Sequence, residues 1–308
     1  MRRMILMLIH ALCLVACGRT DPADTRPLIV CTTTMVADCA REIGGDGFRV
    51  VQLMGEGVDP HLYKPTPRDV ALISEANLVL YSGLHLEGRL VNTFRLLPEG
   101  KTVGIADSIP HARLLHSPEY HDAPDPHVWF DASLWCLAAN RAADALQDLK
   151  PELAETIEAN RMRYVNELQA LHDESIRKIA SIPVPRRVLV TAHDAFNYFS
   201  KAYGIEVKSI QGLSTESEAS LSRVNELTTL LVERNIPAVF VESSVPAKTV
   251  RALIEGAKSK GANVRIGGEL FSDAAGKKGT PEGTYIGMFR HNVDVITRAL
   301  GAAVEEPR

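Results

Sequence analysis

The sequence lacks the local signatures of several protein classes. It contains neither an HExxH motif nor a GxSxG turn, which argues against the metalloproteases and hydrolases that use them. Its five cysteines form no CxxC pair, so a zinc site built on cysteine is not expected. It has no run of Lys and Arg, and its formal net charge is −4, so no nucleic-acid partner is expected.

The chain also lacks an apolar run long enough to cross a membrane. The apolar run near the N-terminus falls short of the ~18–20 residues that a bilayer requires, and two arginines precede it. This pattern predicts a signal peptide over residues 1–16. The segment Leu14-Val15-Ala16-Cys17 resembles a bacterial lipobox, so we expect Cys17 to be lipidated. An ordinary cleaved signal with an incidental cysteine is the alternative. Residues 17–27 are predicted to form a lipidated polar tether.

Three cysteines remain beyond the tether. Cys31 lies in an apolar segment that reads as a strand, and Cys39 and Cys136 lie in predicted helices. An odd number of cysteines cannot form a complete disulfide framework in an exported protein. We therefore expect all three to be buried thiols.

The composition is that of a globular protein large enough for two domains. The 308 residues are 45% hydrophobic and 23% charged. Short apolar strands alternate with helices in two series, which predicts parallel sheets. The expected fold is α/β, with an N-terminal lobe over residues 28–150 and a C-terminal lobe over residues 186–305.

Residues 151–181 lie between the two series and predict one long helix. Apolar side chains recur at helical spacing, and Pro151 suits the first helical turn. We expect this helix to be a rigid connector between the lobes. A dimerising coiled coil is the alternative, although the apolar spacing drifts from a strict heptad. We expect a monomer.

Four polar residues follow predicted strands or precede a helix. His61 and His127 each stand in an Asp-Pro-His sequence with an aromatic residue close behind. His193 follows the strand-like segment RRVLVTA, and Asp273 follows NVRIGGELF. Open parallel sheets bind ligands at the carboxyl ends of their strands. The two Asp-Pro-His sequences are either unrelated loops or rigid turns that present two histidines to one ligand.

Three imidazoles and one carboxylate would suit a divalent metal ion. Such a set makes a four-ligand tetrahedral site for zinc, and other first-row ions can use it. Proline before each of the first two histidines restricts the backbone, which lowers the entropic cost of holding the ring in place.

Several longer segments resemble one known family. They are "MGEGVDPHLYKPTPRD", "YSGLHLE", "DPHVWFD", "RRVLVTAHDAFNYFSKAYG", "VFVESSVPAKTV" and "GGELFSDAAG…GTYIGMFRHNVD". These segments, in this order, resemble the zinc- and manganese-binding solute-binding lipoproteins of ABC importers, from about residue 27 to 300. The resemblance implies two α/β lobes joined by one long rigid helix, with the metal bound in the cleft between them. It implies four metal ligands: His61, His127, His193 and Asp273.

The resemblance also implies a function. A member of this family is a non-enzymatic receptor that binds Zn2+, with Mn2+ as a second candidate, and delivers it to an ABC permease in the cytoplasmic membrane. It would be periplasmic or on the cell surface, held to the membrane by its lipid anchor. The alternatives are a metal-dependent hydrolase, a manganese-preferring receptor and a surface adhesin.

Other polar residues are expected to have supporting or structural roles. Glu242 ends a predicted strand and is expected to orient a ligand imidazole from behind. We expect His85 to hydrogen-bond a backbone carbonyl and His291 to be structural. The remaining histidines of interest precede the second Asp-Pro-His turn, where we expect a solvated loop, with weak auxiliary metal binding as the alternative: His111, His116 and His121.

Overall fold

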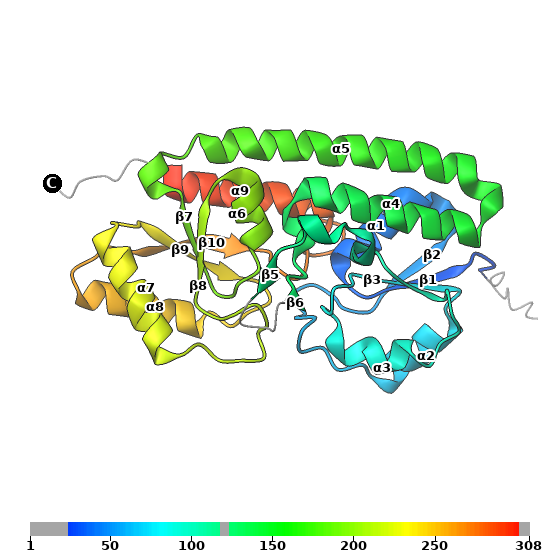
Figure 1. The fold of residues 1–308 in the computed structure, drawn as a ribbon, viewed down its shortest axis with the longest axis horizontal. Coiled ribbons are helices and arrows are strands. Elements are labelled where there is room, and N and C mark those ends of the chain that lie inside the picture. The colour runs from blue at the N-terminus through cyan, green and yellow to red at the C-terminus, as the bar shows by residue number, and fades with distance from the viewer. Residues whose placement is uncertain (1–23, 118–122, 302–308) are drawn as a thin grey trace, which may run out of the picture.

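The computed structural model describes residues 24–117 and 123–301, which form two α/β lobes. Figure 1 shows one long helix, α5, running along both lobes. The predicted signal peptide, Cys17 and His121 lie outside the described residues. No helix among the described residues has the length and apolar character needed to cross a membrane.

The N-terminal lobe is built on a four-stranded parallel sheet. Its strand order is β2-β1-β3-β4, with β1 in register with both β2 and β3. All four residues of β1 are buried, which explains its continuous apolar sequence. The strands are β1 (Leu28–Cys31), β2 (Arg49–Gln52), β3 (Leu78–Tyr81) and β4 (Thr102–Gly104).

The three longer helices of this lobe, α1, α2 and α4, begin at residues whose side chains cap them. The Thr66 side chain accepts a hydrogen bond from the backbone of Asp69, whose carboxylate bonds back to the Thr66 backbone. Asp131 caps the helix that follows the second Asp-Pro-His turn. The helices are α1 (Thr34–Gly44), α2 (Pro67–Glu75), α3 (Val91–Phe94) and α4 (Ala132–Leu149). A two-stranded antiparallel ribbon lies between the lobes, formed by β5 (His116–Ser117) and β6 (Ala123–Pro124).

The connector is helical, as predicted. A short 3-10 turn, Pro151–Leu153, leads into α5 (Ala154–Ala180), which has 27 residues. Its apolar stripe packs within the chain against α1, α4 and α9, and includes the fully buried Tyr164 and Leu168. An apolar stripe that is already covered leaves no seam for the alternative coiled coil.

The C-terminal lobe contains two parallel strand pairs. β7 (Val188–Thr191) pairs with β8 (Glu206–Ser209), and β9 (Ala238–Glu242) pairs with β10 (Arg265–Leu270). β7 also lies beside β9. The helices are α6 (Asn197–Tyr203), α7 (Leu221–Glu233), α8 (Lys248–Ser259) and α9 (Tyr285–Gly301).

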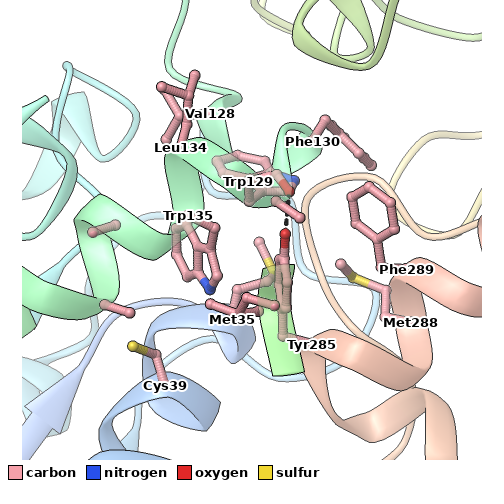
Figure 2. Packing of buried hydrophobic residues seen from close by; sticks show 14 of the residues in the cluster. Met35, Cys39, Val128, Trp129, Phe130, Leu134, Trp135, Tyr285, Met288 and Phe289 are labelled. Atoms are coloured by element: carbon pink, nitrogen blue, oxygen red, sulfur yellow. Dashed lines mark hydrogen bonds between the residues drawn. The ribbon is translucent and has the colours of Figure 1, made fainter. Parts of the chain in front are cut away.

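One hydrophobic core extends through both lobes. Figure 2 shows Met35 of α1 and Trp135 of α4 packed around Tyr285 at the start of α9. The rings of Trp135 and Tyr285 stack with centroids 5.3 Å apart. The Tyr285 hydroxyl also donates a 2.7 Å hydrogen bond to the backbone carbonyl of Trp129. The lobes therefore share a packed interface in addition to the connecting helix.

The three cysteines within the described residues are free and buried, as predicted. Burial raises the pKa of the Cys31 thiol to about 12 and that of Cys136 to about 11. Burial raises the pKa of Cys39 as well. Thiols held in this neutral state behave as small apolar side chains and are poor metal ligands.

Candidate metal centre

The structure brings the four predicted residues together between the two lobes. Their ligand atoms all lie within 4.8 Å of one another. His61 lies in the loop after β2, and His127 directly precedes the 3-10 turn that leads into α4. His193 comes two residues after β7, and Asp273 comes three residues after β10. Each lobe thus supplies two of the four side chains.

The two Asp-Pro-His turns have the same local construction. The Asp59 Oδ1 accepts a 2.8 Å hydrogen bond from the backbone N–H of His61. Asp125 Oδ1 accepts a 2.9 Å bond from the backbone N–H of His127 in the same way. An aspartate that bonds the backbone two residues ahead forms an Asx turn, and the intervening proline restricts it further. Each histidine is therefore presented by a stiff turn.

Each of these aspartates also reaches the other lobe through its second oxygen. The Thr215 hydroxyl donates to Asp59 Oδ2 over 2.5 Å. The side-chain amide of Asn197, in α6, donates to Asp125 Oδ2 over 3.2 Å. The turns that present the first two histidines are thus connected directly to the lobe that carries the other two ligands.

The spacing of the four ligand atoms matches a tetrahedral site. His61 Nε2 lies 3.2 Å from His127 Nε2. Asp273 Oδ1 lies 3.6 Å from His127 Nε2 and 3.4 Å from His193 Nε2. Four ligands at about 2.0–2.2 Å from one zinc ion in a tetrahedron are separated by roughly 3.3–3.6 Å. These three separations are therefore close to the edges of a zinc tetrahedron.

Two ligand atoms of the cluster are buried without a hydrogen-bond partner among the described residues. His127 and His193 are 0% exposed and Asp273 is 1% exposed, whereas His61 is half-buried. Neither His193 Nε2 nor Asp273 Oδ1 has a hydrogen-bond partner among the described residues. Leaving such atoms unpaired is costly, and a cation between them removes that cost. The residues present therefore fit a bound divalent metal ion.

Carboxylates lie beside the Nδ1 atoms of the two fully buried imidazoles, on the ring edge away from the cluster. Glu242 Oε2 lies 2.5 Å from Nδ1 of His193, and its Oε1 accepts the backbone N–H of the same histidine. Glu242 thus has the position predicted for it. Asp125 Oδ1 lies 2.8 Å from Nδ1 of His127. Such partners fix the tautomer that leaves Nε2 free for a metal.

The role of Asp125 was missed in the sequence, although a signal for it existed. The repeat of Asp-Pro-His drew attention to the histidines, but it contains the aspartate as well. Only the second aspartate reaches its histidine ring, because Asp59 bonds the backbone of His61 but not its side chain. Among the described residues, the ring Nδ1 of His61 has no hydrogen-bond partner. The three imidazoles are therefore not equivalent.

Burial and charge shift the pKa values of three cluster residues. Burial lowers the pKa of His61 to about 3, which keeps its ring neutral and able to accept a metal. Burial also acts to lower the pKa of His193, but the negative charges of Asp273 and Glu242 outweigh it and raise that pKa well above its usual value. Burial acts to raise the pKa of Asp273, and the charge of His193 outweighs it and lowers that pKa. In the metal-free protein His193 and Asp273 thus favour each other's charged forms, and a bound metal ion would replace the proton on His193.

The loop that carries Asp273 is fastened to the N-terminal lobe. The indole N–H of Trp129 donates a 2.9 Å hydrogen bond to the backbone carbonyl of Ser272. The backbone N–H of Ala275 donates a 2.7 Å bond to the Thr34 hydroxyl in α1. Asp273 therefore lies between two anchors on the opposite lobe, which restrict its position relative to His61 and His127.

A cavity of about 300 Å³ lies beside His61, with residues of both lobes in its walls. Leu84 and Leu86 contribute from one lobe and Leu213 from the other. At its rim, Arg89 and Glu216 form a 2.8 Å ion pair across the lobes. His61 is thus the one cluster residue in contact with this cavity.

The other histidines lie outside the cluster. His291 Nε2 lies 3.1 Å from the backbone carbonyl of Glu269, which agrees with its predicted structural role. The prediction that His85 bonds a backbone carbonyl is wrong, because the described part of the chain gives it no hydrogen-bond partner. His85 is exposed, in a left-handed turn with a φ of 67°. His111 and His116 are exposed near the β5–β6 ribbon, away from the four-residue cluster.

Comparison with known proteins identifies relatives over nearly the whole chain. The family model described as "Zinc-uptake complex component A periplasmic", ZnuA, matches residues 29–299. The manganese-binding lipoprotein MntA of Bacillus subtilis is 47% identical over 302 residues, covering 96% of this chain and 98% of that protein. The zinc-binding protein TroA of Treponema pallidum is 45% identical over 287 residues, covering 92% of each chain.

The fold agrees with these sequence matches. The structure of the periplasmic zinc-binding protein TroA from Treponema pallidum superimposes with a TM-score of 0.88, covering 90% of this chain and all of the other. The family match and the relatives span both lobes, the connecting helix and all four cluster residues. The chain therefore belongs to the ZnuA family of periplasmic zinc-uptake components.

Proposed function

We propose that this protein is the extracytoplasmic metal receptor of an ABC importer. It binds one divalent ion through His61, His127, His193 and Asp273 and delivers that ion to a permease in the cytoplasmic membrane. The observation that carries the proposal is the cluster itself, in which buried His193 Nε2 and Asp273 Oδ1 have no hydrogen-bond partner within the part of the chain that the structure describes. Two ligands from each lobe make the ion a bridge across the cleft.

This donor set favours zinc, and manganese binds the same site more weakly. Neutral imidazoles bind zinc more tightly than manganese. The names of the relatives include both metals, manganese for the Bacillus subtilis protein and zinc for the Treponema pallidum protein. Competition calorimetry on the metal-free protein tests the preference. We expect one zinc ion per chain and a higher affinity for zinc than for manganese. A higher affinity for manganese at equilibrium would support a manganese-preferring receptor instead.

The same chemistry argues for a receptor rather than a hydrolase. A metal-dependent hydrolase keeps a coordination position open for water or substrate. Four protein ligands fill a tetrahedral shell, and three of the four are almost completely buried. A screen for esterase and phosphatase turnover with bound zinc tests this inference. Turnover that disappears in His193→Ala would establish the hydrolase alternative.

The proposed location depends on the N-terminal segment. We infer that Cys17 carries a lipid that holds the receptor to the membrane, where the permease can receive the ion. The Bacillus subtilis relative is named a lipoprotein. Cys17→Ser is expected to move the protein from the membrane fraction to the soluble fraction. Mass spectrometry that finds an unmodified Cys17 in the wild-type protein would contradict the anchor.

A further inference from the structure

The two carboxylate oxygens of Asp273 have different surroundings. Oδ1 faces the imidazoles, 3.4 Å from His193 Nε2 and 3.6 Å from His127 Nε2, and has no hydrogen-bond partner among the described residues. Oδ2 accepts a 3.2 Å hydrogen bond from the Ser244 hydroxyl. One oxygen therefore has no hydrogen bond and faces the imidazoles, and the other accepts a hydrogen bond from a serine.

Ser244 is held in place by the strand pair that leads to Asp273. It comes two residues after the end of β9, which pairs with β10 through Glu242 and Leu270. The backbone N–H of Ser243 extends this pairing with a 2.9 Å bond to the Leu270 carbonyl. The position of Ser244 relative to Asp273 is thus set by backbone hydrogen bonds.

A second hydroxyl orients the first. The Ser244 Oγ lies 2.8 Å from the Oγ of Ser272, which is fully buried. A hydroxyl has one proton to donate, so Ser272 donating to Ser244 leaves the Ser244 proton for Asp273 Oδ2. Hydrogen bonds arranged in such a chain strengthen one another. Ser272 is itself fixed because its carbonyl accepts the indole N–H of Trp129.

The number of Asp273 oxygens that reach the metal decides the size of its coordination shell. With Oδ2 held by Ser244, Asp273 supplies one oxygen, and the shell consists of four ligands, as zinc prefers. With Oδ2 released, the carboxylate can supply both oxygens and make a five-ligand shell. A larger shell with more oxygen donors suits manganese better.

We propose that Ser244 is a specificity-determining residue that holds Asp273 to coordination through one oxygen and so favours zinc over manganese. This inference rests on the proposed function, because it takes the four-residue cluster as the metal site. Ser244 itself does not contact the ion and acts only by positioning Asp273. The adjacent Ser243 supplies a matched comparison, since its Oγ is buried and has no hydrogen-bond partner among the described residues.

The test compares three single variants of the full receptor: Ser244→Ala, Ser244→Thr and Ser243→Ala. Zinc and manganese dissociation constants are measured for each by competition titration. We expect Ser244→Ala to lower the ratio of zinc affinity to manganese affinity by roughly tenfold. Tenfold is the lower end of the loss of metal affinity expected when a residue that hydrogen-bonds a metal ligand is removed. Ser244→Thr keeps the hydroxyl and should keep the wild-type ratio. Ser243→Ala should also leave the ratio unchanged.

The absorption spectrum of bound Co2+ gives a second readout that general loss of stability does not change. Tetrahedral Co2+ has intense visible bands that weaken when a fifth ligand binds. We expect weaker bands in Ser244→Ala alone. An unchanged affinity ratio and cobalt spectrum in Ser244→Ala would overturn the role of Ser244, as would a Thr variant that behaves like the Ala variant. Failure of the wild-type protein to bind either metal would instead refute the proposed function.

Discussion

Asp38 makes the stability of this fold depend on pH. It lies in α1, is 6% exposed, and accepts a 2.8 Å hydrogen bond from the backbone N–H of Tyr285 at the start of α9. Burial raises the pKa of Asp38 from 3.8 to about 6, and nearby Glu42 adds to the rise while Arg41 opposes it. The carboxylate thus joins the N-terminal lobe to a helix of the other lobe at the cost of a buried charge.

The magnitude and sign follow from this shift. Because the folded protein holds the Asp38 proton more tightly than the unfolded chain does, the contribution of Asp38 to stability is most favourable below about pH 4 and is lost as the pH rises through 6. A shift of about two pKa units corresponds to about 3 kcal/mol at neutral pH. Asp38→Asn carries no charge at any pH, and its side-chain oxygen can still accept the Tyr285 N–H. We expect this variant to be more stable than wild type above pH 6 by up to about 3 kcal/mol, with the difference vanishing near pH 4.

Denaturant unfolding of the metal-free proteins between pH 4 and 8 measures the difference. Asp38→Ala is the control, because it removes both the charge and the acceptor. It should lose the same pH dependence but leave the buried Tyr285 N–H unpaired, which costs about 1–3 kcal/mol. If the difference in unfolding free energy between wild type and Asp38→Asn is the same at pH 4 and pH 7, the argument from the buried charge is wrong.

Three further predictions concern the metal. Zinc at a thousandfold excess over its Kd should stabilise the wild type by about 4 kcal/mol. In a thermal melt, alanine at any of the four cluster positions should reduce this stabilisation, whereas the control His291→Ala should keep it. Asp125→Asn should lower zinc affinity by roughly 10- to 100-fold in calorimetry, because it weakens the partner of His127 Nδ1. His193→Glu should move the competition between metals toward manganese, since an oxygen replaces a nitrogen ligand; an unchanged zinc preference would argue against His193 as a ligand.

Much of the fold could be predicted because its long elements carry strong patterns. The strands of both lobes are short apolar runs, and α5 buries residues at helical spacing, such as Ile157, Tyr164 and Leu168. Three of the four cluster residues, His127, His193 and Asp273, lie close to a strand end or a helix start, whereas His61 lies in the loop nine residues after β2. Local sequence was sufficient for the long elements, whereas for the site it only placed the polar residues where ligands bind, and the full set of four ligands came from the resemblance to a known family.

The contacts between distant segments could not be predicted in this way. The bonds from Asp59 to Thr215 and from Asp125 to Asn197 join residues 156 and 72 positions apart. The same holds for Ser244, which neighbours the predicted Glu242 but acts on Asp273. Short elements such as α3 and the β5–β6 ribbon have two to four residues each, too few to show any periodicity.

The shared core has a consequence for the order in which the protein can fold. A ribosome makes the N-terminal lobe first, yet the core around Met35 and Trp135 includes Tyr285 and Phe289 of α9. Until α9 has been made, this part of the first lobe lacks the side of its covering that α9 supplies and exposes large apolar side chains to water. The first half of the chain is therefore not an independent folding unit, and nascent chains that end before residue 285 should be the ones that need protection from aggregation.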